Sequence, residues 1–116
     1  MTLDKKFTNF VVADKNMNPV IIQNIESIKD ICRRHKVSKL YAFGSVCTDK
    51  FSVQSDIDFI VAFQSRFFDG YVDNFLSLEK ELEETLKHEV DLVAEETLIN
   101  PYFIKVVNQT KTPIYE

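Results

Sequence analysis

The sequence has 116 residues, of which 45% are hydrophobic and 28% charged, and its formal net charge is −4. This length favours a single domain over residues 1–116 that buries a core of its own. The acidic balance, without a basic stripe, argues against direct binding to nucleic acid through its phosphates, whereas a small anionic substrate bridged by metal cations stays compatible with it.

The N-terminal part of the chain carries mixed signals followed by a clear helix start. For residues 1–17 two alternatives stay open, an edge strand or a loose arm. Asn18 and Pro19 then supply the residue types of a helix N-cap and a first helical position. Apolar residues follow at helical spacing, at Ile21, Ile25, Ile28 and Cys32. A helix is therefore predicted from Pro19 to the basic run at residues 33–35, where cations suit the helix dipole.

Four segments have the composition of strands. Residues 39–43 (KLYAF) form a short apolar run that Gly44 ends. Residues 57–63 (IDFIVAF) are the strongest candidate, because β-branched and aromatic residues dominate them. A third strand is predicted at residues 89–93 (EVDLV), and a final edge strand at residues 112–115.

Two further helices complete the pattern. One amphipathic helix has an apolar side made of Val72, Phe75, Leu78, Leu82 and Leu86. The acidic run on this helix is interpreted as a solvated face, and it comprises Glu79, Glu81, Glu83 and Glu84. Asn100 and Pro101 begin another short helix by the same cap-plus-proline logic. Together the elements predict an α+β (α/β-like) fold, with a small mixed sheet flanked by helices.

Two carboxylates stand at the head of the strongest strand. Side chains alternate across a strand, so Asp56 and Asp58 point to one face while Ile57 and Phe59 can face the core. Two unit charges ~4 Å apart repel by about 4 kcal/mol at an effective dielectric of 20. Three compensations are open: solvation at the strand end, protonation of one carboxylate, or a bridging cation.

Two neighbouring features favour the bridging cation. Gly44 lets backbone approach a ligand closely, and Ser45 supplies a hydroxyl and an amide suited to a phosphate oxygen. Asp91 lies inside the third strand, where an unpaired acid is disfavoured. If that strand lies beside the one with Asp56 and Asp58, the three carboxylates can hold two metal ions ~3.5–4 Å apart. The alternatives are an ordinary turn at Gly44-Ser45 and an edge-strand Asp91 that faces solvent.

This combination resembles the minimal nucleotidyltransferase family of the polymerase-beta-like superfamily. The shared pattern is Gly44-Ser45, a ten-residue spacer, Asp56-x-Asp58 and the later strand residue Asp91. Ser55 also fits, since the family often has serine immediately before the first aspartate. Order and spacing agree over residues 39–93. The resemblance therefore implies the polymerase-beta-like nucleotidyltransferase fold.

The resemblance also implies a reaction, namely magnesium-dependent transfer of AMP from ATP to an acceptor hydroxyl. Asp56, Asp58 and Asp91 would hold two Mg²⁺ ions, and Asp91 would also accept the proton of the attacking hydroxyl. The nucleotide-binding residues would be Gly44, Ser45 and Ser55. Stand-alone members of this size are similar to the antitoxin half of two-gene modules that adenylylate a tyrosine on an all-helical HEPN ribonuclease. A HEPN-domain partner is therefore expected, and self-association stays open.

One departure from the family pattern leaves other functions open. Many members continue Gly-Ser-x-Ala-Arg-Gly, whereas Thr48 and Asp49 stand here in place of the arginine and the glycine. Threonine cannot imitate the fork of donors that arginine offers to phosphate, and Asp49 adds a charge of the wrong sign. The first alternative is a non-catalytic, partner-binding domain of the same fold. A further alternative is transfer to a small molecule such as an aminoglycoside, which the lack of a second domain disfavours.

The cysteines and the hydropathy bear on the cellular setting. Cys32 and Cys47 are the only cysteines, so a disulfide framework is excluded, and we expect both to be small buried side chains. No apolar run approaches the ~20 residues of a membrane-spanning helix, and no signal peptide is visible. We therefore expect a cytoplasmic protein that does not enter a membrane.

Overall fold

In the computed structural model, residues 17–116 are described, so the strand or arm expected at residues 1–17 lies outside the described part except for Met17. The helices are α2 (Pro19–Gln23), α3 (Ile25–Arg34), α4 (Tyr71–Leu86) and α5 (Pro101–Thr110). The strands are β1 (Val37–Phe43), β2 (Ile57–Phe63), β3 (Val90–Ala94) and β4 (Thr112–Tyr115). Two short 3₁₀ turns, η1 (Gly44–Cys47) and η2 (Glu95–Thr97), follow β1 and β3.

The four strands form one mixed sheet in the order β3-β2-β1-β4. β1 is antiparallel to both β2 and β4, whereas β2 and β3 run parallel. The parallel pair is possible because α4 crosses over between its two strands. All four predicted strands are therefore present, and β4 lies at an edge as expected.

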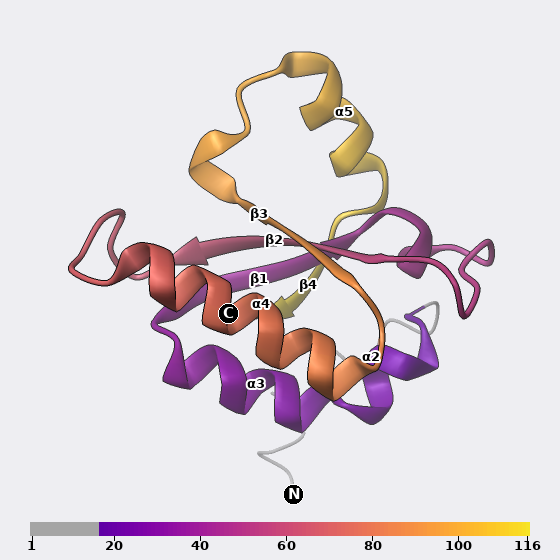
Figure 1. The fold of residues 1–116 in the computed structure, drawn as a ribbon. Helices are drawn as coiled ribbons and strands as arrows, with labels where there is room; N and C mark the ends of the chain where they lie inside the picture. The colour runs from indigo at the N-terminus through magenta and orange to yellow at the C-terminus, as the bar shows by residue number, and fades with distance from the viewer. Residues whose placement is uncertain (1–16) are drawn as a thin grey trace, which may run out of the picture.

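The helices cover the two faces of the sheet unequally. α3 and α4 lie side by side below the sheet, and α5 stands above it (Figure 1). Side chains of β2 alternate between the faces, so Ile57 and Phe59 join the larger core with α3 and α4. Ile60 points the other way and packs with Phe43 of β1 and Val107 of α5. The smaller core therefore attaches α5 to the face opposite the main core.

The first predicted helix is interrupted at Asn24. Asn18 caps α2 as expected, because its Oδ1 accepts from the Val20 amide at 2.9 Å. Asn24 then leaves the helical conformation (φ −111°, ψ 14°), and its side-chain amide donates to the Val20 carbonyl at 2.8 Å. This side chain competes with the backbone for a helical acceptor, which explains the break between α2 and α3.

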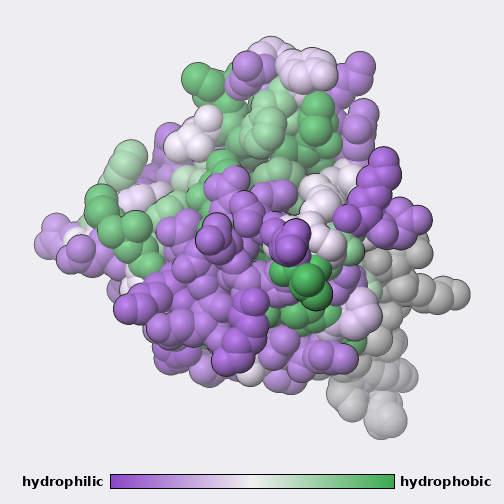
Figure 2. Space-filling model, turned by 45° about the vertical axis from the view of Figure 1, so that its right-hand side comes forward, coloured by the Kyte–Doolittle hydropathy of each residue, from purple (hydrophilic) through white to green (hydrophobic). Residues whose placement is uncertain are grey.

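The second predicted helix is present, but its apolar side is shorter than expected. Leu78, Leu82 and Leu86 are buried, and Phe75 is partly buried against the core. Val72 is 66% exposed, so its assignment to the core side is wrong. It lies in the first turn of α4, where it lines an open surface pocket beside β3. Exposed apolar side chains also gather over α5 at the top of the molecule (Figure 2). They are Ile99, Tyr102, Phe103 and Val106.

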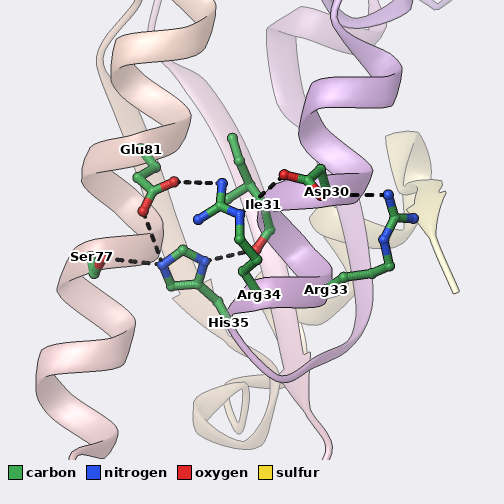
Figure 3. Close-up of polar contacts among 7 residues, drawn as sticks. All are labelled: Asp30, Ile31, Arg33, Arg34, His35, Ser77 and Glu81. Atoms are coloured by element: carbon green, nitrogen blue, oxygen red, sulfur yellow. Dashed lines mark hydrogen bonds and ion pairs between the residues drawn. The ribbon is translucent and has the colours of Figure 1, made fainter.

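The acidic run of α4 is not merely solvated, because three of its members have defined partners. Glu81 binds Arg34 at 2.9 Å and lies 3.4 Å from the buried His35, which links α4 to the end of α3 (Figure 3). Glu83 accepts from the Val90 amide at 3.0 Å. Glu79 accepts from the backbone of β3 as well, at Leu92. These two residues lie four apart and cover outward amides of an edge strand, which would otherwise be open to pairing.

Candidate functional site

Asp58 and Asp91 are brought together by the register of the two parallel strands. They are Cα partners across β2 and β3, so both side chains leave the sheet on the same face. That face is the one that carries Ile60 and α5. Asp56 lies two residues before Asp58, just ahead of β2, and is exposed like Asp91, whereas Asp58 is half-buried. The sequence predicted that these acids meet only if the two strands are neighbours. The structure meets this condition, because β2 and β3 pair directly.

The electrostatics of Asp58 report how closely the three acids are grouped. The pKa of Asp58 is raised from 3.8 to about 6, most strongly by burial, then by the charge of Asp91 and then by that of Asp56. Desolvation penalises the ionised form, and neighbouring like charges do the same. Asp58 is thus the central, least hydrated member of an acidic trio formed by Asp56, Asp58 and Asp91.

Gly44 places backbone directly against this trio. It directly follows β1 and lies in the left-handed region (φ 81°), where a residue with a Cβ is strained. A Cβ built on Gly44 would lie 2.5 Å from Oδ2 of Asp58. The neighbouring Phe43 pairs with Asp58 in the β1–β2 register, which accounts for the close approach. A residue with a Cβ would therefore be strained at this position and would require the Asp58 carboxylate to shift.

Ser45 and Thr48 lie together in the turn that follows Gly44. Ser45 is half-buried in η1, and its carbonyl accepts from both the amide and the hydroxyl of Thr48, each at 2.9 Å. The Thr48 hydroxyl also accepts from the Lys50 amide at 3.1 Å. The residue in the family's arginine position therefore serves to close the turn.

Ser55 has its hydroxyl turned into its own loop. Its Oγ accepts from the Ser52 amide at 3.1 Å and lies 3.2 Å from the Ser52 hydroxyl. Its carbonyl, which immediately precedes Asp56, lies 3.0 Å from Nδ1 of His88. Since a carbonyl only accepts, His88 carries a proton on Nδ1 and donates it. Its ring also packs on Phe51, with centroids 5.0 Å apart.

His88 is thus a residue of the site's surroundings that the sequence pattern did not reveal. His88 follows α4, but Lys87 is the C-cap of that helix and donates its amide to the Glu83 carbonyl. His88 instead fastens the loop before Asp56 to the segment before β3. No local periodicity signals a contact between residues 33 positions apart.

Comparison with known proteins identifies the family. Residues 26–116 match the family model described as polymerase beta, nucleotidyltransferase. The chain belongs to this family. It is an enzyme of the nucleotidyltransferase type, and the predicted fold is confirmed.

Relatives and solved structures agree with this assignment. Two Methanocaldococcus jannaschii proteins named as candidate protein adenylyltransferases are 29% and 33% identical to the chain over 96 residues, which is 76% of this chain and 95% of each relative. A solved candidate minimal nucleotidyltransferase has a TM-score of 0.65 at 27% identity, over 80% of this chain and 91% of its own. One chain of a solved complex between a tri-AMPylated Shewanella oneidensis HEPN toxin and an MNT antitoxin shares the fold, with a TM-score of 0.56 at 22% identity, over 79% and 69% of the two chains.

The acidic trio of this nucleotidyltransferase offers hard oxygen donors, the type that Mg²⁺ prefers. Within residues 17–116, however, no three such side chains already stand in a metal-binding arrangement. Mutual repulsion keeps like charges apart until a cation joins them. The side chains of Asp56 and Asp91 are exposed, and that of Asp58 is half-buried. The chemistry of the three donors therefore fits a divalent cation.

The cysteines of the nucleotidyltransferase differ from each other. Cys32 is fully buried, and burial raises the pKa of its thiol to about 12. Cys47 is only half-buried, so the expectation of two buried cysteines holds for Cys32 alone. Among the described residues, no helix is both long and apolar enough to cross a bilayer.

Proposed function

We propose that this chain transfers AMP from ATP to a hydroxyl group on a partner protein, with Mg²⁺ as its cofactor. The observation that carries the proposal is the position of Asp58, which lies between the charges of Asp56 and Asp91 and against the backbone of Gly44. Such a grouping is costly for a folded protein unless a cation offsets the repulsion. A metal-bridged triphosphate is the ligand that this chemistry suits best.

Each residue of the site has a role in this proposal. Asp56 and Asp58 bind two Mg²⁺ ions, and Asp91 binds one of them. When bound, these ions neutralise the charge that develops on the reacting phosphate. The turn at Gly44 and Ser45 holds the triphosphate close to Asp58. Ser55 belongs to the nucleotide site only if its hydroxyl exchanges its present bond to Ser52 for one to the ligand.

Asp91 suits the acceptor side of the reaction because it is exposed and open to an approaching hydroxyl group. In the transfer, the acceptor oxygen forms a bond to the α-phosphorus of ATP, and the bond to the bridging β-phosphate oxygen breaks. Asp91 takes the proton from the attacking hydroxyl, and pyrophosphate leaves. The carboxylate therefore contributes general-base catalysis at the outer edge of the site.

The nature of the acceptor is supported by the relatives. The two Methanocaldococcus jannaschii proteins are named for adenylyl transfer to protein, and the AMPylated toxin is the partner in the Shewanella oneidensis complex. We therefore propose a HEPN-domain protein as the partner, with this chain as the antitoxin. A partner of that kind would supply the acceptor hydroxyl.

The test is an adenylylation assay with labelled ATP, Mg²⁺ and purified HEPN-domain proteins, beginning with any that an adjacent gene encodes. Wild type should attach one or more AMP groups to a tyrosine of the partner, and Asp58→Asn should attach none. An aminoglycoside serves as the small-molecule acceptor for comparison. Failure to label every HEPN-domain partner at saturating ATP and Mg²⁺ would refute the proposal.

A second candidate is suggested by Thr48, whose hydroxyl closes the turn where an arginine would face phosphate. In this alternative the chain binds and neutralises its partner without transferring a group. The same experiment separates the two functions. If Asp58→Asn neutralises the partner as well as wild type does and neither protein labels it, binding alone is the function.

A further inference from the structure

The Gly44 amide is held by a residue far away in the chain. Its N–H donates to Oγ1 of Thr110 at 2.8 Å. Thr110 is the last residue of α5 and is half-buried. It lies outside the Gly44–Asp91 segment that carries the family pattern. The contact therefore joins the C-terminal helix to the turn beside the acidic trio.

The position of Thr110 is fixed from both sides along the chain. Before it, Val107 is buried in the smaller core, which fastens α5 to the sheet. After it, Thr112 pairs with Ala42 of β1 and donates its hydroxyl to the Thr110 carbonyl at 2.9 Å. The Thr110 hydroxyl is thus a preplaced acceptor whose location does not depend on the turn at Gly44.

Gly44 also lies against the carboxylate of Asp58. Asp58 Oδ2 occupies the space that a Cβ of Gly44 would need. A small movement of Gly44 therefore changes its separation from the carboxylate directly. If the N–H lost its acceptor, this half-buried amide would have to turn toward water, and the backbone of the turn would move with it.

We propose that Thr110 is a positioning residue that holds the Gly44 turn against Asp58 and so sets the geometry for nucleotide transfer. The effect on transfer rests on the function proposed above, whereas the effect on the turn does not. Thr110 touches no reacting atom. It acts through Gly44, in the way that supporting hydrogen bonds hold a site in its productive geometry.

The test compares two substitutions of Thr110. Thr110→Val keeps the shape and removes the hydroxyl, and Thr110→Ser keeps the hydroxyl. The chain has only two glycines, so the Gly44 amide is easily resolved by NMR and Gly70 serves as the internal reference. We expect faster amide exchange at Gly44 in Thr110→Val, no change at Gly70, and near wild-type exchange at both in Thr110→Ser.

Transfer kinetics measured below the melting temperature of each variant give the second readout. We expect kcat/KM to fall by about tenfold in Thr110→Val and by less than about twofold in Thr110→Ser. A general loss of stability would lower the melting temperature but would not produce this difference in kcat/KM between Thr110→Val and Thr110→Ser. Unchanged Gly44 exchange in Thr110→Val, or altered exchange with unchanged kinetics, would overturn the inference. If wild type itself transfers nothing, the proposed function fails, and Gly44 exchange alone decides whether Thr110 holds the turn.

Discussion

Asp58 and Asp91 are paired residue to residue across parallel strands, and the negative charge of Asp91 is a direct cause of the raised pKa of Asp58. The acidic trio is therefore a product of strand register. A shift by one residue in β3 would send Asp91 to the face of the main core and separate the two charges. The site and the β2–β3 pairing are consequently one structural feature.

Gly44→Ala should destabilise the protein more than a glycine substitution at a free turn. The variant combines backbone strain at φ 81° with a steric conflict, 2.5 Å, between the new Cβ and Oδ2 of Asp58. Gly70→Ala is the matched control, because Gly70 has the same φ and no atom within 4 Å of the added Cβ. In urea unfolding we expect a loss of about 1 kcal/mol for Gly70→Ala and about 1–3 kcal/mol more for Gly44→Ala. Equal losses would show that the Asp58 carboxylate moves aside freely.

Asp58→Asn should stabilise the metal-free protein at neutral pH, because it removes the central charge of the trio. A rise in melting temperature of about 2–5 °C is expected from this relief of repulsion. Mg²⁺ should raise the melting temperature of wild type by binding only the folded state, and should have no such effect on Asp58→Asn. A variant that melts lower and keeps its response to Mg²⁺ would show that the trio is not a metal site.

The stability of the metal-free protein should depend on pH through Asp58. Its pKa is raised to about 6 in the folded state from the ordinary value of 3.8, so between these values the folded state binds more protons than the unfolded state. The free energy of unfolding should therefore fall as the pH rises from about 4 to about 6, and level off above that. The measurement is denaturant unfolding in EDTA, expressed as wild type minus Asp58→Asn so that other titrations cancel. A flat difference across this window would contradict the prediction.

The hydrogen bond between the Glu83 carboxylate and the edge strand β3 should contribute measurably to stability. Glu83→Ala leaves the Val90 amide without its acceptor, 3.0 Å away in wild type, and should cost about 1–2 kcal/mol in the free energy of unfolding. Glu84→Ala is the control, since Glu84 is an exposed neighbour on the same helix and the chemical change is identical. If both substitutions have the same effect, helix propensity and not the strand edge accounts for it.

His88 should limit the motion of the loop that leads to Asp56. His88→Phe keeps a ring against Phe51 but removes the donor to the Ser55 carbonyl. Hydrogen exchange of residues 48–56, followed by mass spectrometry, should become faster in this variant. His88→Asn, whose amide can replace the Nδ1 donor, should retain more of the protection. Unaltered exchange in His88→Phe would mean that packing of the ring alone holds the loop.

Local patterns were sufficient for most of the elements. Residues 57–63 were predicted as a strand and form β2 with the same bounds, and α5 begins at Pro101 with Asn100 as its cap. The interruption at Asn24 was missed because helical spacing of apolar residues is the same on both sides of it. Val72 was misassigned for a related reason, since periodicity gives the direction of a side chain and not the extent of the surface it meets.

The sequence by itself determined which residues could form the site. Strand alternation predicts that Asp56 and Asp58 share a face, and Gly44, which has no Cβ, directly follows a predicted strand. Only the tertiary structure decided that Asp91 joins them and that Thr110 and His88 hold the surrounding turns. The physical reason is that alternation and helical periodicity act between near neighbours, whereas strand register and contacts across 33 or 66 residues depend on how the whole chain packs.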